Sequence, residues 1–173
     1  RIASSLRYRI NNKIHWHRHG RTFTDTFVSK IIRKKYLSDD TGFDFANSLS
    51  QLEGEKFVYL PLHFQPECSS CPLGGDYAHQ DLLINLLLSK LPSDWLVVVK
   101  KHVRKGGKDY TFNRLRKNSR VVIADNRIRS LDLVKSSSAI ATITGTAGFE
   151  GFLNHKPVLM FGSYFYMDAP NVF

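Results

Sequence analysis

Short runs of apolar, β-branched or aromatic residues alternate with stretches of helical pattern through most of the chain. The five apolar runs, which predict strands, are 57–62, 95–100, 120–124, 139–143 and 157–161. Helical pattern is found between them, at 77–91, 109–117, 130–136 and 146–154. Strands that are apolar on both faces are typical of a parallel sheet covered by helices on each side. The alternation therefore predicts an α/β fold with a doubly wound, Rossmann-like parallel sheet.

Positive charge is concentrated near the start of the chain. Of a net charge of +10, residues 1–36 carry ten Lys and Arg against one acid, whereas residues 37–173 carry fifteen against fourteen. Residues 37–55 are polar and rich in turn formers, which indicates a connection. We therefore expect a basic N-terminal helical segment and linker at 1–55 and a Rossmann-like domain at 56–173. A domain built to bind nucleic acid carries a basic face through its folded body, and this pattern meets that expectation only weakly.

The basic segment has two interpretations. Phe23, Phe27 and Ile31 share one face of a helix whose other side is cationic. Such a helix packs its apolar stripe on a neighbouring domain or lies on an anionic membrane surface. The alternating histidines at 15, 17 and 19 have no carboxylate or cysteine nearby, so a metal site is disfavoured. The apolar runs of the chain are far shorter than the ~20 residues of a membrane span.

A glycine-rich turn follows the fourth predicted strand, and in open parallel sheets ligands bind beyond the carboxyl ends of the strands. The turn reads Thr144-Gly145-Thr146-Ala147-Gly148, with Glu150 one helical turn later. Small residues let the backbone approach a ligand, and the helix that follows presents N–H donors to an anion. Glu150 would then accept hydrogen bonds from ribose hydroxyls. The alternative is a tight turn with a capping threonine and a surface glutamate.

Basic and acidic side chains follow two other predicted strands. The second strand ends in Lys100-Lys101-His102, where strand alternation puts Lys100 and His102 on one face. A histidine there donates to a phosphate or acts as an acid near neutral pH, although a structural histidine is the commoner outcome. Glu67, after the first strand, offers a base or an acceptor for a hydroxyl group.

Several other site types are disfavoured by the sequence. It contains no GxSxG nucleophile turn, no phosphate-binding loop with its lysine and no GxGxxG, which argues against hydrolase, NTPase and NAD-dehydrogenase function. Cys68 and Cys71 form a lone CxxC, and a zinc ribbon needs a second pair. We therefore predict no metal site.

Seven sequence elements in a fixed order resemble those of bacterial capsule polysaccharide biosynthesis proteins, a group that includes Kdo transferases and related glycosyltransferases of surface glycans. The elements are YLPLHFQPE (59–67), PLGG (72–75), Gln80, the step from Leu91-Pro92 to Trp95, VKKH (99–102), TITGTAGFE (142–150) and KPVLMFG (156–162). The resemblance extends over residues 57–166. The family typically reads Lys-Glu-His-Pro where this chain has Lys100-Lys101-His102-Val103, so the histidine is kept while the acid and the proline are replaced.

The resemblance implies a GT-B-type enzyme whose C-terminal half binds a nucleotide sugar, with an acceptor-binding half that would precede residue 1. The implied activity is metal-independent transfer of a sugar, from a donor such as CMP-Kdo, to a glycan or glycolipid acceptor of the capsule, with no cofactor. His102 and Lys100 would stabilise the departing phosphate, the turn from Thr144 to Gly148 would bind it, Glu150 would hold the ribose, and Glu67 would lie near the donor sugar. The implied location is the cytoplasm, at the inner face of the bacterial inner membrane.

Two other function classes remain open at this stage. The replaced proline is compatible with a sugar-nucleotide epimerase or with an inactive donor-like domain. Alternatively, residues 1–36 make the chain a basic module that docks on an anionic membrane or on nucleic acid, although we expect no specific nucleic-acid partner.

Overall fold

The computed structural model describes residues 43–65, 67, 72–102, 115 and 117–173. The basic segment at 1–36, the two cysteines and all but two residues of the helix expected at 109–117 lie outside this part. The interpretations given to them above, and the domain division that depends on the basic segment, therefore stay predictions.

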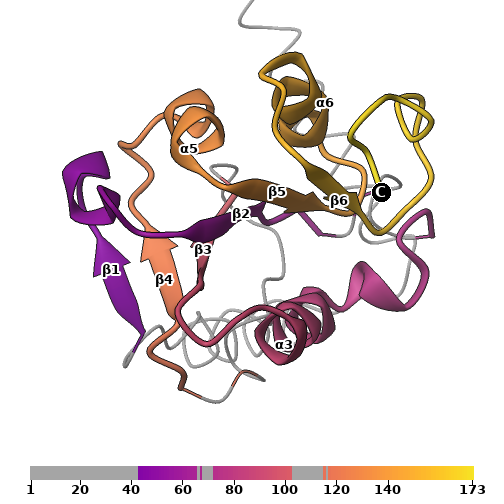
Figure 1. Cartoon of the computed structure of the whole chain (residues 1–173). Coiled ribbons are helices and arrows are strands. Elements are labelled where there is room, and N and C mark those ends of the chain that lie inside the picture. Colours follow the sequence, from indigo (N-terminus) through magenta and orange to yellow (C-terminus); the bar gives the residue numbers. More distant parts are fainter. Residues whose placement is uncertain (1–42, 66, 68–71, 103–114, 116) are drawn as a thin grey trace, which may run out of the picture. The chain divides into compact units, whose positions relative to one another are not determined.

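The described residues form one six-stranded sheet in which every pair of neighbouring strands is parallel (Figure 1). The five predicted strands are confirmed, with ends that differ by one residue at most. They are β2 (Phe57–Pro61), β3 (Leu96–Lys100), β4 (Val121–Ala124), β5 (Ala139–Thr142) and β6 (Val158–Met160). The strand order is β1-β4-β3-β2-β5-β6. The chain thus moves outward from β2 through β3 to β4, then returns to place β5 on the other side of β2.

Helices cover both faces of the sheet, which is why its strands are apolar on both sides. Helix α3 (Gln80–Lys90) lies on one face, and α5 (Ser130–Ser136) and α6 (Thr146–Leu153) lie on the other (Figure 1). Successive side chains of β2 enter different cores: Val58 and Leu60 pack with the residues of α3, whereas Phe57 and Tyr59 pack with those of α5. The doubly wound fold is therefore confirmed. Within the described residues, no helix has the length and apolar character needed to cross a membrane.

A short edge strand, β1 (Asp44–Ala46), and the 3-10 turn η1 (Leu49–Leu52) occupy part of the segment where the sequence predicts a linker. β1 pairs with β4, and Asp44 lies opposite Val122. Of the three residues of β1, only Ala46 is buried, while Phe45 is 47% exposed. Three residues with one buried side chain show no periodicity, so the sequence pattern did not reveal this strand. Residues 44–52 nevertheless belong to the edge of the sheet.

The helix predicted at 77–91 is divided in two. A 3-10 turn, η2 (Gly75–Ala78), comes first, and α3 begins only at Gln80. His79 separates them with φ −82° and ψ 87°, which are not helical values. Because the break makes Gln80 the first residue of α3, its side chain is available to the loop that follows β2. The other two helices are confirmed, α5 with the predicted bounds and α6 one residue shorter.

Candidate functional site

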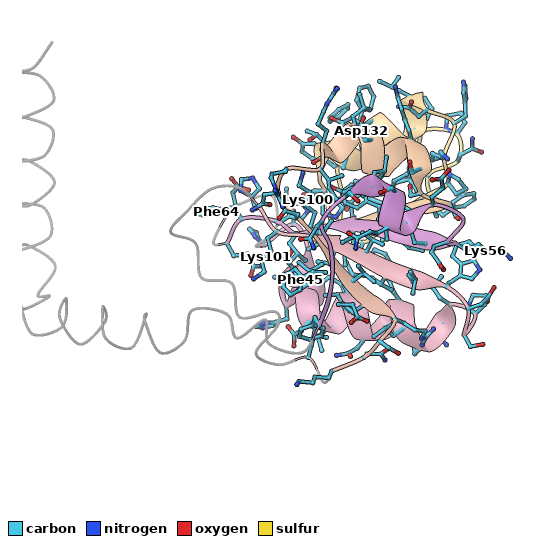
Figure 2. The ribbon with its side chains drawn as sticks, turned by 90° about the vertical axis from the view of Figure 1, so that its left-hand side faces the viewer. Phe45, Lys56, Phe64, Lys100, Lys101 and Asp132 are labelled. Atoms are coloured by element: carbon cyan, nitrogen blue, oxygen red, sulfur yellow. The ribbon has the colours of Figure 1, made fainter. Side chains whose placement is uncertain are left out.

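A pocket of about 390 Å³ opens where the carboxyl ends of β2 and β5 lie side by side. These strands lead in opposite directions across the sheet, and ligands of doubly wound folds bind at such a switch point. Figure 2 shows Phe64, Lys100 and Lys101 at this end of the sheet and Lys56 at the opposite end. The lining residues are Tyr59, Pro61, Leu62, His63, Phe64, Glu67, Lys100, Lys101, His102, Ser130, Thr144, Gly145, Thr146, Ala147, Glu150 and Tyr164.

Most of the predicted site residues line this pocket, although they come from three separate parts of the chain, which follow β2, β3 and β5. His102, Glu67, Lys100, Thr144, Gly145, Thr146 and Glu150 are among the lining residues, and Gly148 is not. Gly148 is buried instead under Tyr166, and a Cβ at this position would lie 2.8 Å from Cγ2 of Thr142. Its small size therefore serves the packing of α6 rather than the approach of a ligand.

A network of neutral polar groups joins the ends of β2 and β5. The Gly145 N–H donates to Oγ1 of Thr142 at 2.9 Å, and the Tyr166 hydroxyl donates to the Gly145 carbonyl. Nε2 of His63 lies 3.5 Å from both Oγ1 of Thr142 and the Thr144 nitrogen. A Cβ at Gly145 would come within 2.7 Å of that Oγ1 atom. The turn is thus fixed by Thr142, His63 and Tyr166, and it has no room for a side chain at Gly145.

Gln80 holds the His63 backbone in place from the start of α3. Its Oε1 accepts the His63 N–H at 2.7 Å, and its Nε2 donates to the His63 carbonyl at 3.2 Å. The Gln80 side chain is buried, so water does not compete for these bonds. The Gln80 amide thus bonds both the N–H and the carbonyl of His63, and these two bonds fix the position of the His63 backbone relative to α3.

His63 is a site residue that the sequence analysis did not select, although it stands within the segment resembling the family. Burial lowers the pKa of His63, and the neighbouring His102 lowers it further, whereas Glu67 raises it. The imidazole is therefore neutral near pH 7. A ring nitrogen without a proton accepts hydrogen bonds, which suits Nε2 beside the Thr144 N–H. Its place directly after β2, at the switch point, is the signal that would have found it.

The N-terminus of α6 faces the pocket. Thr146 and Ala147 open this helix and line the cavity. The first N–H groups of a helix have no partner within it, and the helix dipole favours negative charge at this end. The Gly145 and Gly148 N–H groups already donate within the protein, to Thr142 and to the Gly145 carbonyl. Within this turn, the N–H groups that could receive an anion are therefore those of Thr146 and Ala147 at the start of the helix, and not those of the whole glycine-rich segment.

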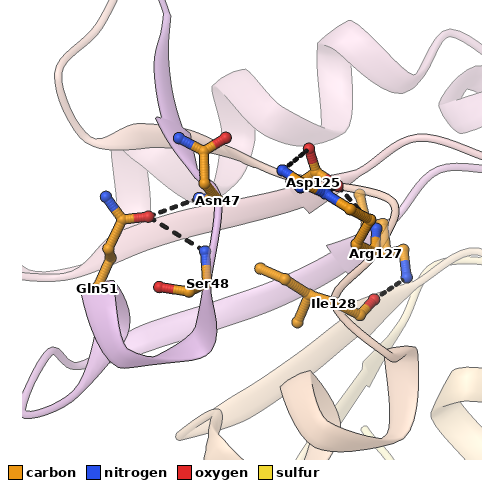
Figure 3. Close-up of polar contacts among 7 residues, drawn as sticks. Asn47, Ser48, Gln51, Asp125, Arg127 and Ile128 are labelled. Carbon is orange, nitrogen blue, oxygen red and sulfur yellow. Dashed lines mark hydrogen bonds and ion pairs between the residues drawn. The ribbon is translucent and has the colours of Figure 1, made fainter.

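The two consecutive lysines at the end of β3 have different surroundings. Lys100 is 7% exposed, and its Nζ donates to the Ile128 carbonyl in the loop between β4 and α5 (Figure 3). Burial lowers the pKa of Lys100, while Asp125 and Asp132 raise it. Asp125 in turn pairs with Arg127, whose guanidinium lowers the pKa of that carboxyl group. The Lys100 ammonium is thus anchored to the protein at the edge of the pocket, where the sequence analysis expects it to contact a phosphate.

Lys101 and His102 lie beyond the end of β3, so strand alternation does not separate them as expected. Both line the pocket together with Lys100. The His102 ring lies 5.8 Å from that of Phe64, centroid to centroid, with the planes tilted by 55°. Together with the start of α6, these two side chains give the pocket a donor-rich, cationic rim suited to an anion.

Carboxylate and hydroxyl groups line other parts of the pocket. Glu67 lies near enough to His63 to raise the pKa of the imidazole. Glu150 has the same effect on Tyr59, whose pKa burial raises to about 12. Among the described residues, no three His, Cys, Asp or Glu side chains come together as ligands for a metal ion. The lining thus combines a donor-rich, cationic rim with carboxylate and hydroxyl groups.

Solved structures with similar folds include two sugar transferases from Thermosulfurimonas dismutans. The KpsC beta Kdo 2,4 transferase is 22% identical, with a TM-score of 0.55 over 77% of this chain and 42% of that one. The KpsC beta Kdo 2,7 transferase is 18% identical, with a TM-score of 0.54 over 69% of this chain and 37% of that one. At these identities the likeness concerns the fold, and the chain spans less than half the length of either enzyme. A comparison with curated proteins found no match.

A family model supplies the stronger comparison. The model described as capsule polysaccharide biosynthesis protein matches residues 7–169. The match extends over nearly the whole chain, including every loop that lines the pocket. The chain therefore belongs to the capsule polysaccharide biosynthesis protein family.

Proposed function

We propose that this chain forms the donor-binding half of a glycosyltransferase that acts in capsule or surface polysaccharide biosynthesis. The donor would be a nucleotide sugar of the CMP-Kdo type, and the acceptor a glycan or glycolipid. The observation that carries the proposal is the pocket at the switch between β2 and β5. Its rim combines Lys101, His102 and the start of α6 with carboxylates, in a chain of this family.

The proposed reaction breaks the bond between the anomeric carbon of the sugar and the phosphate oxygen of the donor. The electron pair of that bond stays on the phosphate, which gains negative charge as the sugar departs. His102, Lys101 and the Thr146 and Ala147 N–H groups would stabilise this charge. An acceptor hydroxyl forms the new bond, and Glu67 would take its proton. Lys100, with its ammonium on the Ile128 carbonyl, would support the rim through position and charge.

The same arrangement supports a reaction without a metal ion or cofactor, since two side chains and a helix terminus supply positive charge. We place the reaction in the cytoplasm at the inner face of the bacterial inner membrane, where residues 1–36 would contact anionic lipids. Their charge of ten Lys and Arg against one acid is the feature that supports this contact.

Nucleotide binding tests the proposal most directly. Thermal unfolding is measured with CMP, UDP and GDP, because a ligand at 100 times its Kd stabilises a protein by about 2.7 kcal/mol. The expected result is a rise in melting temperature with one of the three nucleotides. In titration calorimetry, a protein already saturated with the corresponding nucleotide sugar should then no longer bind that nucleotide. Absence of binding by all three would overturn the proposal. Conversion of a sugar nucleotide without an acceptor would instead indicate an epimerase.

A further inference from the structure

The Tyr166 hydroxyl is a buried polar group to which the proposed reaction gives no role. Tyr166 follows β6 and is 3% exposed, and its hydroxyl donates to the Gly145 carbonyl just before α6. The same carbonyl accepts the Gly148 N–H at 3.0 Å, in the first turn of the helix. Without the hydroxyl the carbonyl would still have a partner, which is all that burial requires of it. The second bond therefore calls for another explanation.

The fold makes room for this hydroxyl at Gly148. A Cβ at that position would collide with the hydroxyl oxygen and would lie 3.0 Å from Cζ of the same ring. The rings of Phe149 and Phe165 lie 5.8 Å and 5.2 Å from the Tyr166 ring, centroid to centroid, and hold it in place. Burial raises the pKa of Tyr166 to about 12, so the hydroxyl keeps its proton at physiological pH. The result is a permanent donor on the Gly145 carbonyl.

The Gly145 carbonyl and the Thr146 N–H belong to one planar peptide group. In a trans peptide the two point in opposite directions, so a bond that fixes the carbonyl also fixes the direction of the N–H. On the other side of Gly145, the N–H is held by Oγ1 of Thr142 at 2.9 Å. Thr146 lines the pocket, and among the described residues its N–H has no backbone acceptor, as is usual for the first N–H of a helix. Tyr166 thus acts on the far end of the peptide group that presents this N–H.

We propose that Tyr166 is a positioning residue, whose hydroxyl holds the Gly145 carbonyl so that the Thr146 N–H is directed at the phosphate of the donor. This inference rests on the proposed function, which supplies the phosphate. Tyr166 is not among the residues that line the pocket, so it acts through the peptide group and not by contact with the ligand. A hydrogen bond to the carbonyl also polarises the peptide group, which makes its N–H a stronger donor.

The affinity of a variant without the hydroxyl tests the inference. Titration calorimetry with CMP, UDP and GDP compares the wild type with Tyr166→Phe, at a temperature at which both are folded. We expect the nucleotide that binds the wild type to bind Tyr166→Phe about fivefold more weakly. Tyr77→Phe is the matched control, since Tyr77 packs on Phe161 and does not line the pocket, and it should keep wild-type affinity. Wild-type affinity in Tyr166→Phe would overturn the inference.

The amide NMR signal of Thr146 separates positioning from a general loss of stability. An N–H that donates to a phosphate forms a short, charge-assisted hydrogen bond, which moves its proton signal downfield. We expect this displacement in the wild type on saturation with the nucleotide, and a smaller displacement in saturated Tyr166→Phe. Weaker binding by Tyr166→Phe with an unchanged displacement would mean that the hydroxyl does not orient the Thr146 N–H, which overturns the inference.

The wild-type titration is informative without any variant, and it separates the two proposals. If none of the three nucleotides binds, the proposed function fails and the role of Tyr166 fails with it. If a nucleotide binds but the Thr146 amide signal does not move downfield, the phosphate lies elsewhere in the pocket, and only the inference about Tyr166 is overturned.

Discussion

The two sides of the pocket are built from different kinds of polar group. On the side of β2 and β5, a neutral network joins His63, Thr142 and Gly145, and Gln80 holds it from α3. On the side of β3, Lys100, Lys101 and His102 bring positive charge or the capacity for it. The neutral side is a hydrogen-bonded network. On the cationic side, the Lys100 ammonium donates to the Ile128 carbonyl, and Lys101 and His102 line the cavity.

This difference indicates a division of roles. A hydrogen-bonded network among buried groups fixes the shape of a site, since each lost partner leaves an unpaired group behind. Charged groups at a rim act on the ligand over a longer range and tolerate more change in the surrounding protein. We therefore expect substitutions on the cationic side to reduce binding and transfer, and substitutions on the neutral side to reduce the stability of the fold.

The largest effect is expected for His102→Ala on the cationic side. If His102 stabilises the departing phosphate, its loss should slow sugar transfer by a factor of about 10²–10³, about 2.7–4 kcal/mol in the transition state. The melting temperature of the protein should change little, because His102 is exposed at the pocket rim, where its ring lies beside Phe64. Steady-state transfer assays and thermal unfolding of the same preparation check both outcomes.

His79→Ala is the control for that experiment. His79 is exposed, separates η2 from α3 and does not line the pocket, so its removal should leave transfer near the wild-type rate. Transfer by His102→Ala at a rate near that of the wild type would exclude His102 from the reaction and weaken the contrast between the two sides.

Two glutamines provide a test of the neutral side. Gln80→Leu leaves the His63 N–H and carbonyl without their partner, at a cost of about 2–3 kcal/mol in the free energy of unfolding. Gln51 also accepts backbone N–H groups, those of Asn47 and Ser48, but it is exposed (Figure 3). Water replaces it there, so Gln51→Leu should cost about 0.5 kcal/mol or less. Urea unfolding measures both, and equal losses would contradict the role given to Gln80.

The same contrast explains which parts of the fold could be predicted from the sequence. The strands from β2 to β6 are continuous apolar runs because both faces are buried, and such runs are visible in the sequence. β1 escaped prediction because three residues with one buried side chain leave no period to read. The division between η2 and α3 escaped because the helical pattern of 77–91 continues through His79, whose backbone is not helical.

For the candidate site, the sequence revealed the cationic side better than the neutral one. Lys100 and His102 stand out by charge and by their place after a strand. His63 also follows a strand, but it carries no charge that marks it. Gln80 does not stand out, since an ordinary amide acquires such a role only through burial and a distant partner. For Lys100, the sequence predicts a place in the pocket but not the hydrogen-bond partner of the ammonium. That partner is the Ile128 carbonyl, which only the folded loop brings near Lys100.

Adjacent lysines test where the boundary between the two sides lies. Lys100→Met leaves the Ile128 carbonyl unpaired and should lower the free energy of unfolding by about 1–2 kcal/mol. Lys101→Met removes a charge at the pocket rim and should weaken binding of the nucleotide about fivefold to tenfold, about 1–1.4 kcal/mol. Thermal unfolding and titration calorimetry separate the two outcomes. Loss of affinity without loss of stability in Lys100→Met would instead place its ammonium among the ligand contacts.

The smallest expected effect is a dependence of stability on pH that originates in His63. Burial lowers its pKa in the folded protein below the ordinary value of 6.5, whereas the unfolded chain keeps that value. Between these two pKa values the unfolded state binds the proton and the folded state does not, so folding is disfavoured as the pH falls below about 6.5. The free energy of unfolding, measured in urea between pH 7 and 5, should therefore decrease more steeply for the wild type than for His63→Gln. All other titratable groups, including the six histidines at 15, 17, 19, 79, 102 and 155, are common to both proteins, so the difference between the two curves belongs to His63. Parallel curves for the two proteins would show that His63 binds its proton equally in the folded and unfolded states, which would contradict a lowered pKa in the folded network.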